Sequence, residues 1–422
     1  MKIAFIINEF PSVSETFILD QMAGLIERGH EVDIYAERPQ RMPERIHGDV
    51  ERLQMIRRTR YREGAPSGRA ARVRSGILRA ARWGWRYPGP LLKGLNVFRH
   101  GRRALNFSML HKVFPMREPT SRYDVVHGHY GPNGVRAVWW REAGILRGPV
   151  VTTFHGYDVN LLPRVQGPRL YEKLFSEGDL FTVGSEFMRK RIVSLGAPAD
   201  KIVRLPMGVN VSKYRFSERR KIEGEFRMLT VARLVEVKGI EYVLKALAKL
   251  KEKGGQFRYQ IAGDGPLRGT LEALAKELGL GNAAEFMGAI SREEALALYE
   301  QAHIFVLASI PTEAGEEENQ PVVLAEAQAT GLPVIATRIG GVPESIREGE
   351  TGLLVPPRDP NALAEASLWL SKHPERWGEM GRAGRRLVES EFNLDKLNDR
   401  LVGVYKEMVS ADGRRPMIAS GA

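Results

Sequence analysis

The fold of this chain is decided by one stretch, residues 318–335, which reads ENQPVVLAEAQATGLPVI. The segment 322–329 predicts a buried helix, closed by Gly331 in the C-cap position with Pro333 just beyond it. An apolar run ends at Ala308 before this stretch, and a short apolar strand begins at Val334. Strand, loop, helix and strand form the unit of an open parallel sheet, and such sheets bind ligands where the loops leave the carboxyl ends of the strands.

Two carboxylates stand eight residues apart in this stretch, Glu318 at the entrance of the helix and Glu326 about two turns further along. At that spacing both side chains could face one cleft. An acid at the start of a helix is also commonly a cap or a partner of the helix dipole. The stretch alone therefore leaves both interpretations of Glu318 open.

The composition is that of an ordinary soluble protein with enough residues for two domains. The chain has 422 residues, of which 43% are hydrophobic and 27% are charged. Cysteine is absent, which excludes a disulfide framework and a thiolate metal site and suits a cytosolic protein. No apolar run has the length of a signal peptide or of a membrane span. We therefore expect a cytoplasmic protein, either free or peripheral on the inner face of the cell membrane.

The net charge of +12 is concentrated in one segment. Residues 38–103 contain seventeen arginines and one lysine against four acids, a net charge of +14. Trp83, Trp85 and Tyr87 are interleaved with the cations, a mixture that suits an anionic membrane surface. An anionic acceptor, or a solvated insertion whose aromatic residues pack on the host domain, are the alternatives. No recognition motif accompanies the charge, so a nucleic-acid partner is not predicted.

Strand and helix patterns alternate through the first half of the chain. Apolar, β-rich runs predict strands at 2–8, 32–36, 123–127, 150–154 and 180–184. Helix patterns cover 15–28 and 186–195, and the basic segments 41–62 and 69–86 are mostly helix-compatible.

Three histidines follow two of these strands. His127 and His129 could point the same way, but no further ligand stands at a recognisable spacing, so no metal site is predicted. His155 opens a polar turn, His155-Gly156-Tyr157-Asp158, at the end of strand 150–154. Such a turn is a ligand position in an open parallel sheet, and a local loop hydrogen bond is the alternative role for His155.

A second sheet is predicted after the interdomain crossing Pro206-Met207-Gly208-Val209-Asn210. Arg233 follows a strand, and Lys238 stands five residues later, just before a helix at 240–251. Two cations beside the free amides of a helix start can form a diphosphate cradle. The turn Gly263-Asp264-Gly265-Pro266 follows the next strand and does not fit the Gly-x-Gly-x-x-Gly fingerprint.

These motifs, in this order, resemble the family 4 retaining glycosyltransferases. The matching elements are the His155 turn, the Arg233 and Lys238 pair, the Gly-Asp-Gly-Pro turn, the two acids at 318 and 326, and Gly-Gly-Val-Pro-Glu at 340–344. The amino terminus, INEFPSVSETFILDQMAGLIERGHEVDIYA, is similar to that of colanic-acid and amylovoran-type exopolysaccharide glycosyltransferases. Its first loop has Pro11 and Ser12 where many members of the family have paired glycines.

The resemblance implies an α/β fold of the GT-B type, in which two Rossmann-like domains with parallel sheets face each other across a cleft. The expected parts are an acceptor-side domain at 1–208 with a basic insertion at about 38–103, a nucleotide-sugar domain at 209–390, a helix at 391–412 that returns to the first domain, and a tail at 413–422.

The resemblance also implies transfer of a hexose from a nucleotide sugar to an acceptor hydroxyl, with retention of the anomeric configuration. A UDP-sugar is favoured over a GDP-sugar, and the expected acceptor is a glycan or a polyprenyl-linked oligosaccharide in exopolysaccharide or other cell-surface polysaccharide synthesis. The sequence contains no Asp-x-Asp metal motif, so no metal cofactor is expected. The alternatives are a nucleotide-sugar epimerase, a glycogen-synthase-like polymerase and a nucleotide-sugar-binding scaffold without turnover.

The same resemblance implies roles for eight residues. The expected catalytic residues are His155, near the anomeric carbon, and Glu318, which would hold hydroxyls of the donor sugar. The expected donor-binding residues are Arg233 and Lys238 at the diphosphate, Gly263 in the turn near the nucleotide, Asn319 and Gln320 at the sugar, and Glu326 at the ribose.

Overall fold

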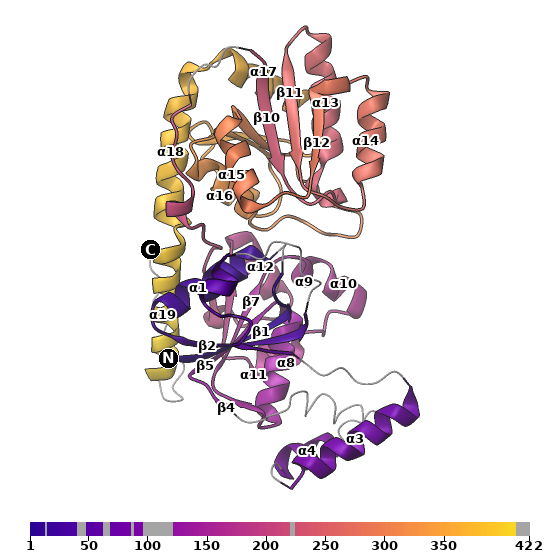
Figure 1. Ribbon diagram of the computed structural model, residues 1–422, viewed down its shortest axis with the longest axis vertical. Coiled ribbons are helices and arrows are strands. Elements are labelled where there is room, and N and C mark those ends of the chain that lie inside the picture. Colours follow the sequence, from indigo (N-terminus) through magenta and orange to yellow (C-terminus); the bar gives the residue numbers. More distant parts are fainter. Residues whose placement is uncertain are drawn as a thin grey trace.

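The computed structural model describes residues 1–12, 15–39, 48–61, 68–85, 88–95, 121–219 and 224–410. Two lobes are stacked one above the other, and each is built on an open sheet covered by helices (Figure 1). Each lobe has its own apolar core on both faces of its sheet. The expected α/β class with two parallel sheets is confirmed.

The first sheet has seven parallel strands in the order β3-β2-β1-β5-β7-β8-β9. Its strands are β1 (Lys2–Glu9), β2 (Glu31–Arg38), β3 (Thr59–Tyr61), β5 (Val125–His129), β7 (Val150–Phe154), β8 (Leu180–Val183) and β9 (Ile202–Arg204). The central strands are continuous apolar runs because helices bury both faces of a parallel sheet. The helices of this lobe are α1 (Thr16–Glu27), α2 (Gly48–Arg52), α8 (Gly131–Glu142), α9 (Tyr157–Asn160), α10 (Leu162–Gln166), α11 (Glu172–Glu177) and α12 (Glu186–Ser194).

Only part of the basic segment is an insertion, because its first half is built into this lobe. The helix-compatible interpretation of 41–62 is wrong at its end, where β3 pairs with β2 at the edge of the sheet. Val50 and Met55 are buried in the core, so tertiary packing decides the conformation here. Two further helices, α3 (Arg69–Trp83) and α4 (Pro88–Leu95), form an arm that extends from the side of the lobe (Figure 1). Residues 96–103, the last part of the segment, lie outside the described residues.

The second sheet has six parallel strands in the order β12-β11-β10-β13-β14-β15. Its strands are β10 (Phe226–Val231), β11 (Phe257–Ala262), β12 (Ala284–Gly288), β13 (Ile304–Leu307), β14 (Val334–Thr337) and β15 (Gly352–Val355). Numbered along the chain, this is the 3-2-1-4-5-6 order of the Rossmann fold, in which the order reverses between β10 and β13. The helices are α13 (Ile240–Glu252), α14 (Arg268–Glu277), α15 (Arg292–Gln301), α16 (Val322–Ala329), α17 (Pro360–Lys372) and α18 (Glu375–Glu391).

The chain crosses between the lobes twice at one place. Val209 exchanges backbone hydrogen bonds with Phe392 (2.8 Å) and Leu394 (3.0 Å). A Cβ at Gly208 would lie 2.6 Å from the Cα of Leu394, so the two crossings touch backbone to backbone. After the second crossing, α19 (Leu394–Ser410) packs on α1 of the first lobe, and α18 and α19 run along one side of both lobes (Figure 1).

The remaining short elements are β4 (Ser121–Arg122), β6 (Leu146–Arg147), and 3₁₀ turns at Ala199–Lys201, Val211–Lys213, Glu236–Lys238, Gly281–Ala283 and Val342–Ser345. Within the described part of the chain, the helices are too short or too polar to cross a bilayer.

Candidate active site

Lys238 and Glu318 meet at the reversal of strand order in the second sheet. Lys238 comes from the loop after β10, and Glu318 comes from the loop after β13. The Lys238 ammonium forms an ion pair with the Glu318 carboxylate, and the hydroxyl of Ser309 donates a hydrogen bond to the same carboxylate oxygen (3.3 Å). The two side chains are only 18% and 14% exposed. Two distant motifs of the sequence therefore form one charged pair at the crevice where this fold binds ligands.

Glycines hold the Arg233–Lys238 loop against its neighbours. Gly239 has φ 57°, and a Cβ there would lie 1.9 Å from the carbonyl oxygen of Ala308. Gly263 has φ 137°, and its Cβ would lie 1.9 Å from the carbonyl oxygen of Ala232. Gly263 thus serves the site by letting the Gly-Asp-Gly-Pro turn support the loop that carries Arg233. The Arg233 side chain is exposed at the end of that loop.

Gly340 and Gly341 pack directly beneath the loop that carries Glu318. A Cβ at Gly340 would lie 2.0 Å from the carbonyl oxygen of Glu318, and one at Gly341 would lie 2.1 Å from that of Asn319. The amide of Gly341 donates a hydrogen bond to the Glu318 carbonyl (3.2 Å). The Gly-Gly-Val-Pro-Glu motif therefore fixes the position of the Glu318 backbone.

The side chains of Asn319 and Gln320 join the two lobes. Asn319 accepts a hydrogen bond from the Ser185 hydroxyl and donates one to the His155 carbonyl (3.1 Å). The Gln320 amide pairs with the backbone of Met207, accepting from its N–H (2.7 Å) and donating to its carbonyl (3.0 Å). In this arrangement both side chains bind protein groups. The expected contact with the donor sugar would therefore be made by the backbone amides of these residues, or by the side chains after they leave their present partners.

Glu326 lies on α16 and is held by two tyrosines. Tyr214 donates a hydrogen bond to one carboxylate oxygen (2.7 Å), and Tyr299 donates to the other (2.9 Å). Burial raises the pKa of Glu326, while these hydrogen bonds and the charge of Arg292 oppose the rise. Arg292 itself forms an ion pair with Asp20 of the first lobe (3.2 Å), so this cluster also lies where the lobes meet.

His155 belongs to a stack of three histidines in the first lobe. The distance between His129 Nδ1 and His155 Nε2 is 3.0 Å, and the rings of His127 and His129 stack at 4.5 Å. Burial lowers the pKa of His155 to about 3 and that of His127 to about 3, and it lowers the pKa of His129 as well. His155 is therefore uncharged at neutral pH, and its ring can take part in hydrogen bonds such as the one with His129. Among the described residues, no group of three potential ligands has a geometry that could hold a metal ion.

The sequence interpretation missed three residues of this region. Glu15 and Tyr130 lie at the strand-order reversal of the first sheet, where the Tyr130 hydroxyl hydrogen-bonds the Glu15 carboxylate. Burial raises the pKa of Glu15, and this hydrogen bond opposes the rise. Tyr130 has φ 72°, a strained conformation for a residue other than glycine. The rule that ligands bind at strand-order reversals could have indicated Glu15; nothing in the sequence indicates the backbone of Tyr130.

Glu344 is the third residue: the sequence indicates its motif but no role for it. It ends the Gly-Gly-Val-Pro-Glu motif of the second lobe and accepts hydrogen bonds from the first two amides of α12 in the first lobe, at 2.8 and 2.9 Å. A carboxylate is favourable at a helix start, because the amides there lack partners and the dipole is positive. Glu344 therefore caps a helix of the opposite lobe.

These observations define a class of protein. Two Rossmann-like lobes present the carboxyl ends of their strands to each other, with a cation–carboxylate pair on one side and an uncharged histidine on the other. This is the arrangement of a two-lobed α/β protein in which the ligand-binding ends of both sheets face each other.

Comparisons with known proteins identify the family. The family model described as Glycosyltransferase Family 4 matches residues 14–213, and the one described as Glycosyl transferases group 1 matches residues 212–387. The chain is 34% identical to a Salmonella typhimurium protein named as a colanic acid biosynthesis glycosyltransferase, WcaL, over 96% of this chain and 100% of that protein. It is 31% identical to the amylovoran biosynthesis glycosyltransferase AmsK of Erwinia amylovora, over 93% and 96% of the two chains.

Among solved structures, Anabaena HepE in complex with UDP and glucose has a TM-score of 0.68 at 17% identity, over 96% of this chain and 99% of that chain. That likeness concerns the fold and confirms the expected GT-B architecture. The chain belongs to the family 4 glycosyltransferases with the GT-B fold.

Proposed function

We propose that this protein transfers a hexose from a nucleotide sugar to a hydroxyl of a glycan or lipid-linked oligosaccharide, with retention of configuration, in exopolysaccharide or cell-surface polysaccharide synthesis. The observation that carries the proposal is the Lys238–Glu318 pair at the strand-order reversal of the second lobe. The pair places an ammonium group, which suits a leaving phosphate, beside a carboxylate, which suits sugar hydroxyls. The names of WcaL and AmsK support the polysaccharide pathway.

The chemistry requires stabilisation of charge in two places. The bond between the anomeric carbon and the phosphate oxygen breaks, so negative charge grows on the diphosphate while the sugar becomes oxocarbenium-like. Lys238 and Arg233 would stabilise the diphosphate, and Glu318 would accept hydrogen bonds from the sugar. The acceptor oxygen then forms the new bond on the face that the phosphate leaves, and its proton passes to a phosphate oxygen.

We propose further that the reaction needs no metal ion, because two side-chain cations are available for the diphosphate and the sequence lacks an Asp-x-Asp motif. UDP is the favoured nucleotide, and GDP is the alternative. The uncharged His155 would donate or accept a hydrogen bond near the anomeric centre.

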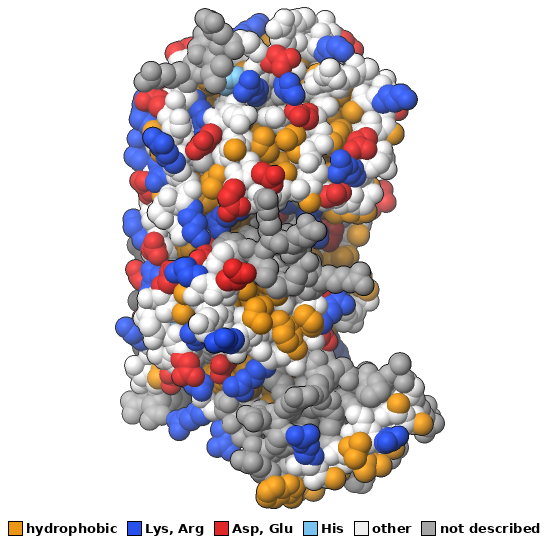
Figure 2. Space-filling model, in the orientation of Figure 1, with side chains coloured by type: hydrophobic (Ala, Val, Ile, Leu, Met, Phe, Trp, Pro, Cys, Tyr) orange, Lys and Arg blue, Asp and Glu red, His pale blue; other side chains and the backbone are white. Residues whose placement is uncertain are grey.

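An anionic membrane surface is the proposed partner of the α3–α4 arm. Exposed apolar side chains lie on both helices, and exposed arginines accompany them, as Figure 2 shows at the lower right. The apolar residues are Ile77, Leu78, Trp85, Leu92 and Leu95. This surface would bring the enzyme to a lipid-linked acceptor from the cytoplasmic side.

A screen of UDP- and GDP-sugars by thermal shift, followed by a transfer assay, tests the function. Lys238→Ala is expected to lower kcat/KM about 100-fold, because loss of one donor to a developing anion costs about that much. Lys245→Ala is the matched control, since Lys245 pairs with Glu241 on the exposed side of α13. Equal turnover of the Lys238 and Lys245 variants would reject the site.

The same assay separates the alternatives. The anomeric proton of the product, followed by NMR, reports retention or inversion, and chelator resistance reports metal independence. An epimerase would change the sugar nucleotide without an acceptor, and a scaffold would bind it without turnover.

A further inference from the structure

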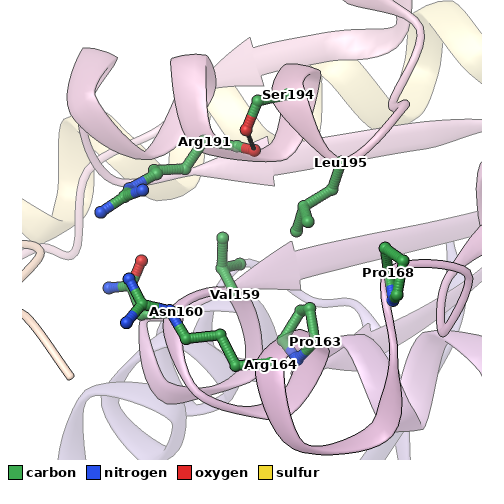
Figure 3. Close-up of a pocket in the computed structure, with 8 residues that line it drawn as sticks. All are labelled: Val159, Asn160, Pro163, Arg164, Pro168, Arg191, Ser194 and Leu195. Atoms are coloured by element: carbon green, nitrogen blue, oxygen red, sulfur yellow. Dashed lines mark hydrogen bonds between the residues drawn. The ribbon is translucent and has the colours of Figure 1, made fainter. Parts of the chain in front are cut away.

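A cavity of ≈ 210 Å³ lies in the first lobe, between α9 and α10 on one side and α12 on the other (Figure 3). It is smaller than the roughly 300–1,000 Å³ of a pocket for a drug-sized ligand, so it suits one sugar residue rather than a nucleotide. The roles proposed above do not use it.

One end of the cavity is polar and positively charged. Arg164 and Arg191 lie there beside Asn160, as Figure 3 shows. Arg191 forms an ion pair with Glu317 (3.1 Å), which leaves a net charge of about +1 from the three charged groups and several guanidinium N–H donors for a ligand. The Arg164 guanidinium packs against the backbone of Gly315, where a Cβ would lie 1.9 Å from its Nη1 atom.

Asn160 is the buried polar group of this cavity. Its side chain donates a hydrogen bond to the Glu317 carbonyl (3.3 Å), and the residue is only 3% exposed. Its Oδ1 atom has no hydrogen-bond partner among the described residues. A buried acceptor without a partner costs free energy, which a ligand hydroxyl would recover.

The other end of the cavity is apolar. Pro168 and Leu195 lie opposite the arginines, with Val159 and Pro163 between them (Figure 3). Such a floor fits the C–H face of a pyranose ring. The cavity thus offers cations for an anionic group, an acceptor for a hydroxyl, and apolar contact for a ring.

The cavity is connected to the active site by one residue. Glu317 contacts both Arg191 and Asn160, and the next residue, Glu318, pairs with Lys238. A ligand bound in the cavity therefore lies against the loop that positions Glu318.

We propose that this cavity binds an acidic sugar residue of the acceptor, a pyranose that carries a carboxylate or a phosphate. Its assignment to the acceptor rests on the function proposed above. Arg164 and Arg191 bind the anionic group, Asn160 accepts from a ring hydroxyl, and an occupied cavity holds the acceptor chain beside Glu318.

Saturation-transfer NMR with D-glucuronate, D-glucose 1-phosphate, D-glucose and inorganic phosphate tests the proposal on the intact protein. At least one of the two acidic sugars is expected to bind about tenfold more tightly than glucose or phosphate, and whichever binds more tightly identifies the anionic group. Arg164→Glu is expected to abolish this preference. Arg169→Glu, an exposed arginine outside the cavity, is the matched control and is expected to keep it.

Ser194→Trp, at an exposed position on the rim, is expected to block all sugar binding in the cavity. Equal binding of glucose and the acidic sugars, or equal loss of binding in the Arg164 and Arg169 variants, would overturn the proposal. This assay requires neither donor nor turnover, so its failure leaves the transferase function standing, and a failed transfer assay leaves the binding result standing.

Discussion

Glu326 allows a test of ribose recognition at a single carboxylate. Tyr214 and Tyr299 each use one lone pair of its oxygens, and a carboxylate has about four acceptor sites, so two ribose hydroxyls can still bind. Glu326→Gln is expected to weaken binding of the cognate nucleoside diphosphate about tenfold, which corresponds to about 1.4 kcal/mol. Calorimetric titration measures the change, and the exposed Glu300→Gln on α15 is the control. Glu326→Gln should weaken binding of the 2′-deoxy nucleotide less than binding of the ribonucleotide. Equal weakening for both nucleotides would contradict contact between Glu326 and the ribose.

The burial of His127 leads us to expect that stability depends on pH in the acidic range. It is fully buried between Tyr405 and Thr153, and burial lowers its pKa from 6.5 to about 3. Between these two values the unfolded chain binds a proton that the folded protein does not, so the free energy of unfolding falls as pH falls, by about 1.4 kcal/mol per pH unit. His127→Gln should make this dependence shallower by a similar amount below about pH 6.5. Urea unfolding across the acidic range checks it, and an unchanged slope would contradict it.

At the scale of residues, the sequence indicated which charged side chains come together when both belong to motifs of the family. Lys238 and Glu318, eighty positions apart, form an ion pair, and their roles at a donor stay a prediction. The contacts of Asn319 with Ser185 and His155 could not be predicted, because they depend on how the lobes meet. The helix-capping role of Glu344 depends on the same geometry.

At the scale of elements, Gly340 is expected to control Glu318 through the backbone. Gly340 and Gly349 both have positive φ, 51° and 77°, so alanine strains both positions by about 1 kcal/mol. Only Gly340 lies under the Glu318 carbonyl, whereas a Cβ at Gly349 meets nothing within 4 Å. Gly340→Ala should therefore lower transfer at least about tenfold beyond Gly349→Ala, because a small displacement of a catalytic group is costly.

Thermal stability and transfer kinetics of the two variants check this expectation. Equal transfer at equal loss of stability would show that Gly340 serves only the fold.

Elements with strong local signals matched the sequence prediction. The helix at 322–329 and the strand from Val334 have the expected bounds, and Gly331 takes φ 89° after the helix. Strand β3 was missed because three residues at a sheet edge carry little periodicity, and its pairing with β2 supplies the missing stability.

At the scale of the whole molecule, two of the contacts that join the lobes come from motifs of the candidate active site, and a third comes from α15. Gln320 binds the crossing at Met207, Glu344 caps α12, and Arg292 pairs with Asp20. The chain length, the crossing at 206–210 and the family resemblance predicted two lobes, but not these contacts, because they require the tertiary arrangement. The backbone that carries Glu318 is therefore tied to both lobes by its neighbours.

We expect the protein to bind a membrane surface through the α3–α4 arm. Trp85 and Leu92 are 78% and 70% exposed, and burying such side chains in an interface gains roughly 1.5–3 kcal/mol each. Replacing both with serine should lower binding to vesicles that contain anionic lipid by at least about tenfold. Ile56→Ser is the control, because Ile56 is also exposed, at 40%, but lies outside the arm.

Vesicle flotation with neutral and anionic lipids measures this binding. The arginines of the arm should make it stronger on anionic lipid and weaker in high salt, since screening acts on exposed charges. Equal flotation with neutral and anionic vesicles, or equal flotation of the arm variant and the Ile56 variant, would mean that the arm serves another purpose. Because the Lys238–Glu318 pair lies in the other lobe, transfer to a water-soluble acceptor should be unchanged in the arm variant, and only transfer to a vesicle-bound acceptor should fall.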